Sequence, residues 1–290
     1  MRRAGIHWIA SYPKSGNTWV RIALACLSNG GQLPDLSQAT GLCPNSAVLK
    51  WMETLLDMPL NDMTPEEQSL MRTEACRLYG QTVTGPAFLK IHDAYDPALF
   101  PPTLSAGSIL IVRDPRDVAP SWADHMGVSL DGAIERMARA DFTLSPPGPE
   151  QRQQIRQRLG SWSGNVLSWL DQAPGPKLLL RYEDMLATPA ACFVALARFA
   201  GLEVSPELVR KTATATSFQA LRAAEDSSGF VERMADQKAF FRRGQAGAWR
   251  QTLSAVQAQR VWNAHHAVMV RLGYGPDGTL SSSPWDGCGG

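Results

Sequence analysis

A short polar segment near the amino terminus carries residue types that could bind an anion. In "IASYPKSGNTWVRIALACL" (residues 9–27), an apolar, strand-like run is followed by small polar residues and then by a helix-like pattern. Backbone N–H groups at the start of a helix point toward a bound anion, and the helix dipole favours negative charge there. Lys14 adds a positive charge, and Ser15 and Thr18 add hydroxyl donors. Gly16 lets the backbone approach closely. The segment is a candidate phosphate-binding loop; a strand–helix turn with an exposed lysine is the alternative.

A second segment carries an arginine and a serine near another expected helix start. In "IVRDPRDVAPSW" (residues 111–122), Asp114 suits the N-cap position, so Arg113 would be the last strand residue. Ser121 would lie about two turns into the helix. Because a guanidinium group binds two oxygens of one phosphate, Arg113 and Ser121 form a candidate phosphate pair. Pairing of Arg113 with Asp114, Asp117 or a surface carboxylate is the alternative.

A third segment places two arginines and a glycine together. In "FFRRGQAGAWRQTLS" (residues 240–254), the adjacent guanidinium groups of Arg242 and Arg243 repel each other unless an anion or solvent lies between them. Gly244 and Gly247 give the backbone freedom to approach a ligand. The segment is a candidate anion-binding loop, and an ordinary solvated basic turn is the alternative.

The elements expected around these segments define the fold class. Four short apolar runs are predicted as strands: residues 7–12, 88–92, 108–114 and 177–184. Three further stretches have the apolar periodicity of helices: residues 17–29, 188–200 and 254–272. The alternation predicts an α/β fold, in which a central parallel sheet is flanked by helices on both faces. Ligands of such sheets bind at the carboxyl ends of the strands, where the three segments would meet.

The chain length suits a single domain. Residues 1–275 of the 290-residue chain are predicted to form that domain, and the Gly- and Ser-rich residues 276–290 are predicted as a disordered tail. The stretches predicted as irregular are candidate lids rather than domains: residues 30–63, 141–150 and 222–241.

Composition argues against several classes of partner. The chain has 28 basic and 27 acidic residues, so its net charge is only +1. A charge this small gives no overall electrostatic attraction to nucleic acid or to an anionic membrane. No apolar run approaches the roughly 18 residues of a membrane span. No signal peptide is recognised, so a cytoplasmic location is expected. The five cysteines are scattered without zinc-ligand or disulfide spacing, which predicts reduced thiols and no metal site.

Taken together, the three segments resemble the sulfotransferases that use 3′-phosphoadenosine 5′-phosphosulfate (PAPS). "YPKSGNTW" resembles the 5′-phosphosulfate loop of that family, "RDPRDVAPS" its 3′-phosphate motif, and "FRRGQAGAW" its RKGxxGDW segment. "YED" at 182–184 and "TSF" at 216–218 match two further nucleotide contacts, and "FLKIH" at 88–92 matches the K-x-H of the catalytic strand. The motifs occur in the family's order from residue 9 to about 250.

The resemblance implies a P-loop-like sulfotransferase architecture and a role for each matching residue. The implied 5′-phosphosulfate ligands are Lys14, Ser15, Gly16, Asn17 and Thr18. The implied 3′-phosphate ligands are Arg113, Ser121, Arg242, Arg243 and Gly244. The implied adenine contacts are Trp19, Tyr182, Thr216 and Phe218. His92 would be the general base, with the catalytic lysines Lys14 and Lys90 nearby; a structural role for His92 is the alternative.

The chain departs from the family pattern at three positions. Arg243 replaces the usual lysine, Ala248 the usual aspartate and Asn17 the usual threonine. The short dimer motif of cytosolic animal members is not evident, so the oligomeric state stays open. The "SGNTW" form and the "RLGY" ending resemble bacterial members.

The expected activity is in-line transfer of a sulfuryl group from PAPS to the hydroxyl group, or amine, of a small molecule. Adenosine 3′,5′-bisphosphate (PAP) would be the other product, and lysine and arginine side chains would neutralise charge without a metal ion. The acceptor pocket is expected from residues 30–80, 122–160 and 222–241, whose Met, Trp and Phe side chains suit an aromatic, lipid or glycopeptide-like acceptor. Those side chains could equally be core.

Two other functions fit part of the pattern. A P-loop-type nucleotide or adenylyl-sulfate kinase would share the fold, but the Walker pattern is absent because Lys14 precedes Gly16. Only Asp114 stands where such a kinase would need a magnesium ligand. A non-catalytic nucleotide-binding module, with His92 purely structural, is the second alternative.

Overall fold

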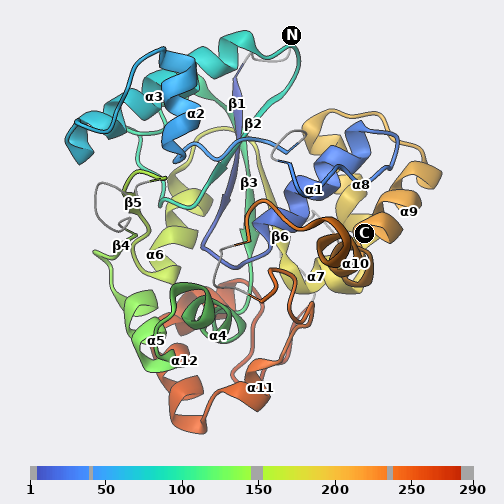
Figure 1. Cartoon of the computed structure of the whole chain (residues 1–290). Helices are drawn as coiled ribbons and strands as arrows, with labels where there is room; N and C mark the ends of the chain where they lie inside the picture. The colour runs from blue at the N-terminus through green and yellow to red at the C-terminus, as the bar shows by residue number, and fades with distance from the viewer. Residues whose placement is uncertain (1–4, 39–41, 145–152, 234–237, 282–290) are drawn as a thin grey trace.

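A four-stranded parallel sheet forms the centre of the molecule (Figure 1). The computed structural model describes residues 5–38, 42–144, 153–233 and 238–281. The strands are β1 (Ile6–Ser11), β2 (Ala87–Ile91), β3 (Ser105–Val112) and β6 (Lys177–Arg181), in the spatial order β2-β1-β3-β6. All four predicted strands are therefore confirmed. The last one ends at Arg181, earlier than predicted, because Tyr182 begins the helix α7 (Tyr182–Ala187). The prediction that Arg113 is the last residue of its strand is wrong, because β3 ends at Val112 and Arg113 lies between it and the N-cap Asp114.

The strand order puts the candidate loops side by side. The chain passes from β1 to β2 on one side, and then crosses to β3 and β6 on the other side of β1. All pairings are parallel, so every strand has its carboxyl end at the same edge. Between β1 and β3 the connections leave in opposite directions, and this switch point is where α/β sheets bind ligands.

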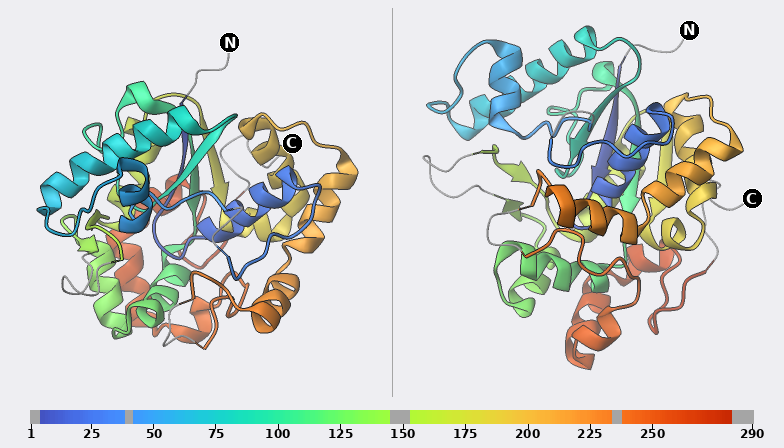
Figure 2. Two further views of the ribbon diagram at one scale, coloured as in Figure 1. Left: turned by 45° about the horizontal axis from the view of Figure 1, so that its top comes forward. Right: turned by 45° about the vertical axis from the view of Figure 1, so that its right-hand side comes forward.

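Helices cover both faces of the sheet (Figures 1 and 2). One layer contains α1 (Asn17–Ser28), α8 (Pro189–Ala200) and α9 (Pro206–Ala215). The other contains α3 (Pro65–Thr82), α4 (Pro115–Met126), α5 (Leu130–Ala138), α6 (Trp162–Leu167) and α12 (Ala255–Arg271). Successive strand residues face opposite layers: Ile109 and Ile111 lie in the first apolar core, whereas Leu110 and Val112 lie in the second. The predicted α/β class is confirmed.

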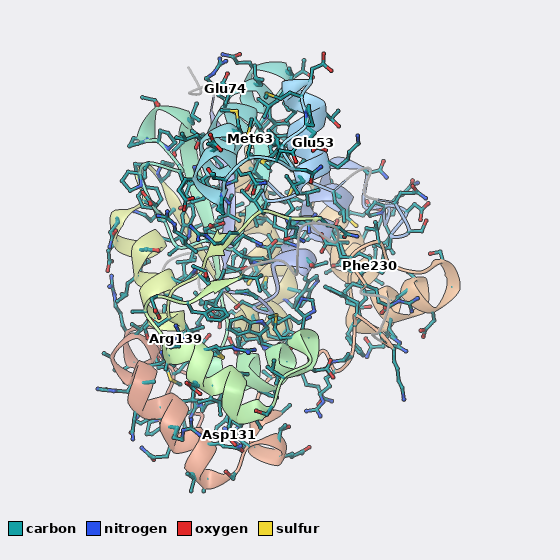
Figure 3. All side chains as sticks on the ribbon, turned by 60° about the vertical axis from the view of Figure 1, so that its left-hand side comes forward. Glu53, Met63, Glu74, Asp131, Arg139 and Phe230 are labelled. Carbon is teal, nitrogen blue, oxygen red and sulfur yellow. The ribbon has the colours of Figure 1, made fainter. Side chains whose placement is uncertain are left out.

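The structure corrects the prediction that residues 30–63 are wholly irregular. They contain α2 (Leu49–Leu56), which buries Leu49 and Met52 against Ala75 of α3. Met63, labelled in Figure 3, follows α2 and packs on the same cluster. A helix with so short an apolar face depends on this tertiary packing, which a local pattern does not reveal.

The remaining elements are short. They are α10 (Phe218–Ser228), α11 (Trp249–Thr252), the antiparallel pair β4 (Thr143–Leu144) and β5 (Gln157–Arg158), the 3₁₀ turn η1 (Pro102–Leu104) and the π-helical turn η3 (Ser168–Gln172). The stretches 141–150 and 222–241, predicted as irregular, thus contain β4 and the end of α10; residues 145–152 and 234–237 lie outside the described residues.

The predicted tail is described only in part. The backbone oxygens of Pro276 and Asp277 accept hydrogen bonds from Arg116 and Arg250, and residues 282–290 lie outside the described residues. Among the described helices, none has both the length and the apolar character needed to cross a bilayer.

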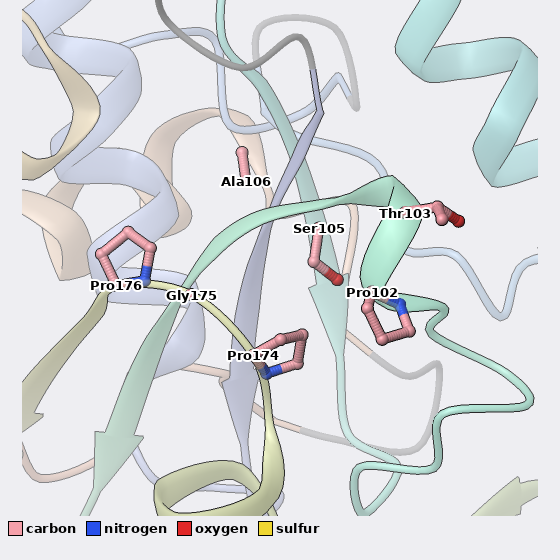
Figure 4. Close-up of a pocket in the computed structure, with 7 residues that line it drawn as sticks. All are labelled: Pro102, Thr103, Ser105, Ala106, Pro174, Gly175 and Pro176. Carbon is pink, nitrogen blue, oxygen red and sulfur yellow. The ribbon is translucent and has the colours of Figure 1, made fainter.

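A hollow of about 380 Å³ lies at the edge of the sheet opposite the candidate loops (Figure 4). It is lined by Pro102, Thr103, Ser105, Ala106, Pro174, Gly175 and Pro176. Ser105 begins β3 and the three last residues precede β6, so this hollow belongs to the amino ends of the strands.

A buried ion pair joins α3 to the end of β2. Arg72 Nη1 lies 2.8 Å from Asp93 Oδ2, and both side chains are 1% exposed. Asp93 also accepts a hydrogen bond from the backbone N–H of Arg158, and its own carbonyl accepts one from Trp169 Nε1. Asp93 therefore fixes the turn that follows His92.

We predict that Arg72→Met destabilises the fold by about 3–5 kcal/mol, because it leaves the Asp93 carboxylate buried without its counter-charge. Chemical denaturation measures the loss. Arg77→Met is the matched control on the same helix, because the Arg77–Glu74 pair is 42% exposed on both sides. Equal effects of the two substitutions would contradict the prediction.

Candidate active site

The first loop has a backbone shape that only a few residue types adopt easily. Lys14 and Gly16 have φ angles of +66° and +106°, both in the left-handed region. For a lysine this conformation costs on the order of 1 kcal/mol, a cost that is typical of functional sites. Asn17, the first residue of α1, anchors the loop to β1 because its Nδ2 donates to Ile9 O at 3.0 Å and to Ser11 Oγ at 3.2 Å. The Asn17 side-chain donors are thus turned toward the strand.

Arg113 joins the first and third segments. Its Nη1 donates to Lys14 O at 3.4 Å, and its Nη2 donates to Gln245 O at 2.9 Å. The guanidinium group also lies 4.2 Å from the centre of the Tyr182 ring. Stacking on the ring leaves the guanidinium edge available for hydrogen bonds. The two loops and the end of β3 therefore converge on one side chain.

Helix α4 holds the third segment in place. The Asp117 carboxylate accepts hydrogen bonds from the backbone N–H of Gly247 at 2.6 Å and of Trp249 at 2.8 Å. Gly244 lies so close to Phe218 that a Cβ atom would come within 2.3 Å of the ring. Its φ angle of +57° also favours glycine.

The two arginines of the third segment turn to different partners. Arg242 forms an ion pair with Asp124 of α4, the helix that also carries the partly exposed Ser121. Arg243 Nη1 donates to Thr252 Oγ1 at 3.0 Å and is exposed. The side-chain partners of both arginines are therefore polar groups of the protein itself.

The predicted adenine contacts form an aromatic group beside the first loop. Trp19 and Tyr182 meet edge to face with ring centroids 5.8 Å apart, and Tyr182 also packs on Gly16. Thr216 is fully buried and its hydroxyl donates to Thr212 O, so this hydroxyl caps its own helix. Phe218 lies beside the third segment through its contact with Gly244.

Several buried polar atoms at these loops have no hydrogen-bond partner within the described part of the chain. They include Ser15 Oγ, Asn17 Oδ1, Trp19 Nε1 and Arg113 Nε. Leaving a buried donor unpaired costs about 1–3 kcal/mol, so such groups mark a place where a polar ligand fits. The cradle suits a ligand that carries both anionic and planar groups.

The lysine of the first loop is in a strongly cationic environment. Burial lowers the pKa of Lys14 to about 8, and the charges of Arg242, Lys90 and Arg113 act in the same direction. Its Nζ also lies 4.7 Å from the centre of the Phe240 ring. The cations that crowd here favour the binding of an anion, since an anion relieves their mutual repulsion.

His92 presents a neutral imidazole at the end of β2. Its Nδ1 lies 2.9 Å from Ser11 O, and because a carbonyl only accepts, Nδ1 carries the proton and Nε2 has the free lone pair. Burial, followed by the charge of Lys90, lowers the pKa of His92 to about 3. The imidazole is therefore unprotonated at neutral pH.

Asp114 does not have the free carboxylate that a magnesium ligand requires. Its two oxygens accept hydrogen bonds from Nε and Nη2 of Arg116, at 2.8–3.1 Å, in a pair that is 1% and 8% exposed. Asp114 Oδ1 also accepts from the backbone N–H of Arg116 as the N-cap of α4. The predicted cap is confirmed, and the kinase alternative loses the residue on which it depended.

Comparison with known proteins decides the family. A family model described as "Sulfotransferase domain" matches residues 6–273. The chain belongs to the sulfotransferase family. The predicted sulfotransferase is thereby confirmed, whereas the predicted bacterial origin stays a prediction.

The sulfotransferase relatives are distant but span most of this chain. Sulfotransferase 1E1 of Cavia porcellus is 26% identical over 253 residues, which cover 83% of this chain and 75% of the relative. Sulfotransferase 1A1 of Rattus norvegicus is 25% identical over 276 residues, with 89% of this chain and 82% of the relative covered.

Two solved structures share the fold. A retinol dehydratase in complex with androsterone and PAP has a TM-score of 0.60 at 21% identity, with 93% of this chain and 81% of that chain covered. Mouse SULT7A1 with PAP has a TM-score of 0.59 at 20% identity, with 92% and 84% covered.

This sulfotransferase site also includes residues that the sequence did not single out. Glu232 accepts hydrogen bonds from Thr18 Oγ1 at 3.1 Å and from Arg21 Nη1 at 2.6 Å, and it lies 3.4 Å from Lys90 Nζ. Arg21 lies three residues after Thr18, so helix periodicity could have placed it on the same face. For Glu232 no local signal exists, because its partners are far away in the chain.

Glu183 braces the turn that carries Arg113. Its Oε1 accepts a hydrogen bond from Asp114 N at 3.0 Å, and its Oε2 accepts one from Tyr274 OH at 2.8 Å. Burial raises the pKa of Glu183 to about 7. A folded-state pKa above the unfolded value means that the folded protein binds the proton more tightly, so stability falls as pH rises toward 7.

We predict that Glu183→Gln removes this pH dependence. Relative to the wild type, the variant should gain about 3 kcal/mol of unfolding free energy between pH 4.5 and 7, because each pKa unit corresponds to 1.36 kcal/mol. Urea denaturation over this pH range measures the difference. Glu207→Gln, at an exposed position of α9, is the control. Parallel stability curves for the wild type and Glu183→Gln would contradict the prediction.

Proposed function

We propose that this sulfotransferase moves a sulfuryl group from PAPS to a hydroxyl group, or an amine, of a small molecule. The observation that carries the proposal is the position of Arg113, which contacts both the Lys14 loop and the Gln245 loop while it stacks on Tyr182. A ligand at this point meets cations at two separate places and aromatic rings between them, which is what a doubly phosphorylated adenosine requires.

The residues fit the two ends and the base of such a donor. The 5′ end would be bound by the first loop, namely Lys14, Ser15, Gly16, Asn17 and Thr18, with Asn17 contributing its backbone N–H. The 3′-phosphate would be bound by Arg113, Ser121, Arg242, Arg243 and Gly244, of which Arg242 would exchange Asp124 for the ligand. The adenine would lie among Trp19, Tyr182, Thr216 and Phe218. Relatives in the same fold were solved with PAP, which supports this assignment.

Catalysis would depend on position and charge, as in phosphoryl transfer. His92 Nε2 would take the proton of the acceptor, a contribution of about 10²–10⁴-fold. Lys14 would neutralise the charge that develops on the leaving phosphate, and Lys90 would bind the sulfuryl oxygens. The low pKa of His92 keeps the imidazole in its proton-accepting form down to about pH 3.

For the acceptor, we propose a small and largely apolar molecule. Phe142 is half-buried and meets the buried core ring of Trp122 edge to face, with centroids 5.5 Å apart, so an apolar surface adjoins the core there. The retinol dehydratase structures contain androsterone and retinol. An aromatic, lipid or glycopeptide-like alcohol fits such surroundings. A cytoplasmic location is part of the same proposal.

The donor is tested by a thermal shift with PAP, ATP and AMP. We expect a large stabilisation by PAP alone, because a ligand that binds only the folded state raises the melting temperature. Arg113→Ala should weaken PAP binding more than about tenfold, since it removes a charged contact. Stabilisation by ATP with Mg²⁺ instead of PAP would favour a kinase.

We predict that His92→Ala abolishes sulfuryl transfer and leaves PAP binding nearly intact. Calorimetry with PAP and a transfer assay on a panel of phenols and alcohols measure the two effects separately. His266→Ala, at an exposed position of α12, is the control. If PAP binding disappears together with activity, His92 is a structural residue.

A further inference from the structure

A carboxylate from a distant segment reaches the catalytic lysine. Residues 229–233 follow α10, drawn in orange in Figure 2, and Glu232 of this segment lies against the start of α1. Each of its two oxygens lies 3.4 Å from Lys90 Nζ. The same carboxylate accepts hydrogen bonds from Thr18 Oγ1 and Arg21 Nη1. One acidic side chain thus connects the phosphosulfate loop with the strand that carries His92.

Glu232 counteracts the effect of burial on the charge of Lys90. The Lys90 side chain is only 12% exposed, and burial lowers its pKa. Arg21 acts in the same direction, whereas Glu232 raises the pKa of Lys90. A buried ammonium group that loses its counter-charge loses its proton more easily. The charged and titratable groups that face Lys90 from the surrounding elements are Lys14, Arg21, Cys43, His92 and Glu232.

We propose that Glu232 is a positioning residue, which fixes the Lys90 ammonium group at the sulfuryl end of the crevice and so lets the enzyme distinguish PAPS from PAP. This inference rests on the proposed function, because it assigns the sulfuryl oxygens to Lys90. It adds a residue that contacts no donor atom itself and acts through the lysine.

The geometry favours a fixed partner over a carboxylate that merely occupies the anion site and leaves when the donor binds. Arg21 Nη1 lies 2.6 Å from Glu232 Oε1, and the Arg21 side chain is 4% exposed. Nε and Nη2 of Arg21 donate to Cys43 O at 3.2 and 2.8 Å, so the guanidinium group cannot follow a departing carboxylate. Removal of Glu232 from its place would leave a buried arginine without a counter-charge, which is costly.

The experiment compares PAPS and PAP affinities across pH. Calorimetry is performed from about pH 6 to about pH 9 on the wild type, Glu232→Gln and the control Asp226→Asn. Asp226 is exposed and pairs with Arg222 on α10, so the control removes a nearby negative charge without a contact to Lys90. PAP lacks the sulfuryl group and therefore serves as an internal reference for each variant.

We expect the PAPS affinity of Glu232→Gln, taken relative to its PAP affinity, to be about tenfold lower than that of the wild type. The loss should be larger at higher pH, because the pKa of Lys90 is lower without the carboxylate. Glu232→Asp, which retains the charge, should restore part of the preference and serves if the glutamine variant does not fold. On a Lys90→Met background, Glu232→Gln should have no further effect on the ratio, since it acts through the lysine.

Two results would overturn the inference while the proposed function stands. A PAPS-to-PAP ratio that is unchanged at every pH, even with lower thermal stability, would make Glu232 a structural residue only. Tighter PAPS binding by Glu232→Gln would make its carboxylate a competitor of the donor. If the wild type itself binds neither nucleotide, the proposed function fails first, and this outcome is distinct from the other two.

Discussion

The arrangement of the site depends on one cation that is shared between two loops. Arg113 stands at the end of β3 and donates to the carbonyl of Lys14 on one side and to the carbonyl of Gln245 on the other. The backbone of the first loop is strained at Lys14, and the third loop has little regular structure around Gln245. Both loops therefore take their relative position from a side chain that directly follows a rigid strand, an arrangement that gives a binding site its precision.

Charge in the crevice is partly balanced by carboxylates of the protein itself. Arg242 is paired with Asp124, and Lys90 is paired with Glu232, whereas Lys14 has a lowered pKa and an aromatic ring for a neighbour. Pairing of this kind lets the chain fold with several cations near one edge of the sheet. Burial and the neighbouring cations lower the pKa of Lys14. In the proposed reaction this lysine neutralises the negative charge that develops on the leaving phosphate.

Much of this could be predicted because the signals are local. Apolar runs identified all four strands, and Asp114 marked the start of α4 through its preference for the N-cap position. The motif residues lie in the loops after these strands, so the parallel sheet alone brings them to one edge. Helix α2 escaped prediction because its short apolar face is stable only against α3.

The residues that sequence reasoning missed act over long distances in the chain. Glu232 is 142 positions from Lys90, and Asp117 is 130 positions from Gly247, so neither contact has a local pattern. The assignment of Asn17 and Thr216 to the donor site stays a prediction, and their side chains bond to β1 and to Thr212 instead of pointing freely into the crevice. Local patterns identify which loops form the site, and only tertiary packing decides which atoms remain available.

The switch point between β1 and β3 has a mechanical consequence. Helix α1 continues from the first loop into one layer, and α4 continues from Arg113 into the other. A molecule bound between the two loops would therefore contact both layers at once, in addition to the contact that Arg113 makes with Lys14. A shift of either layer would change the geometry at one end of that molecule relative to the other.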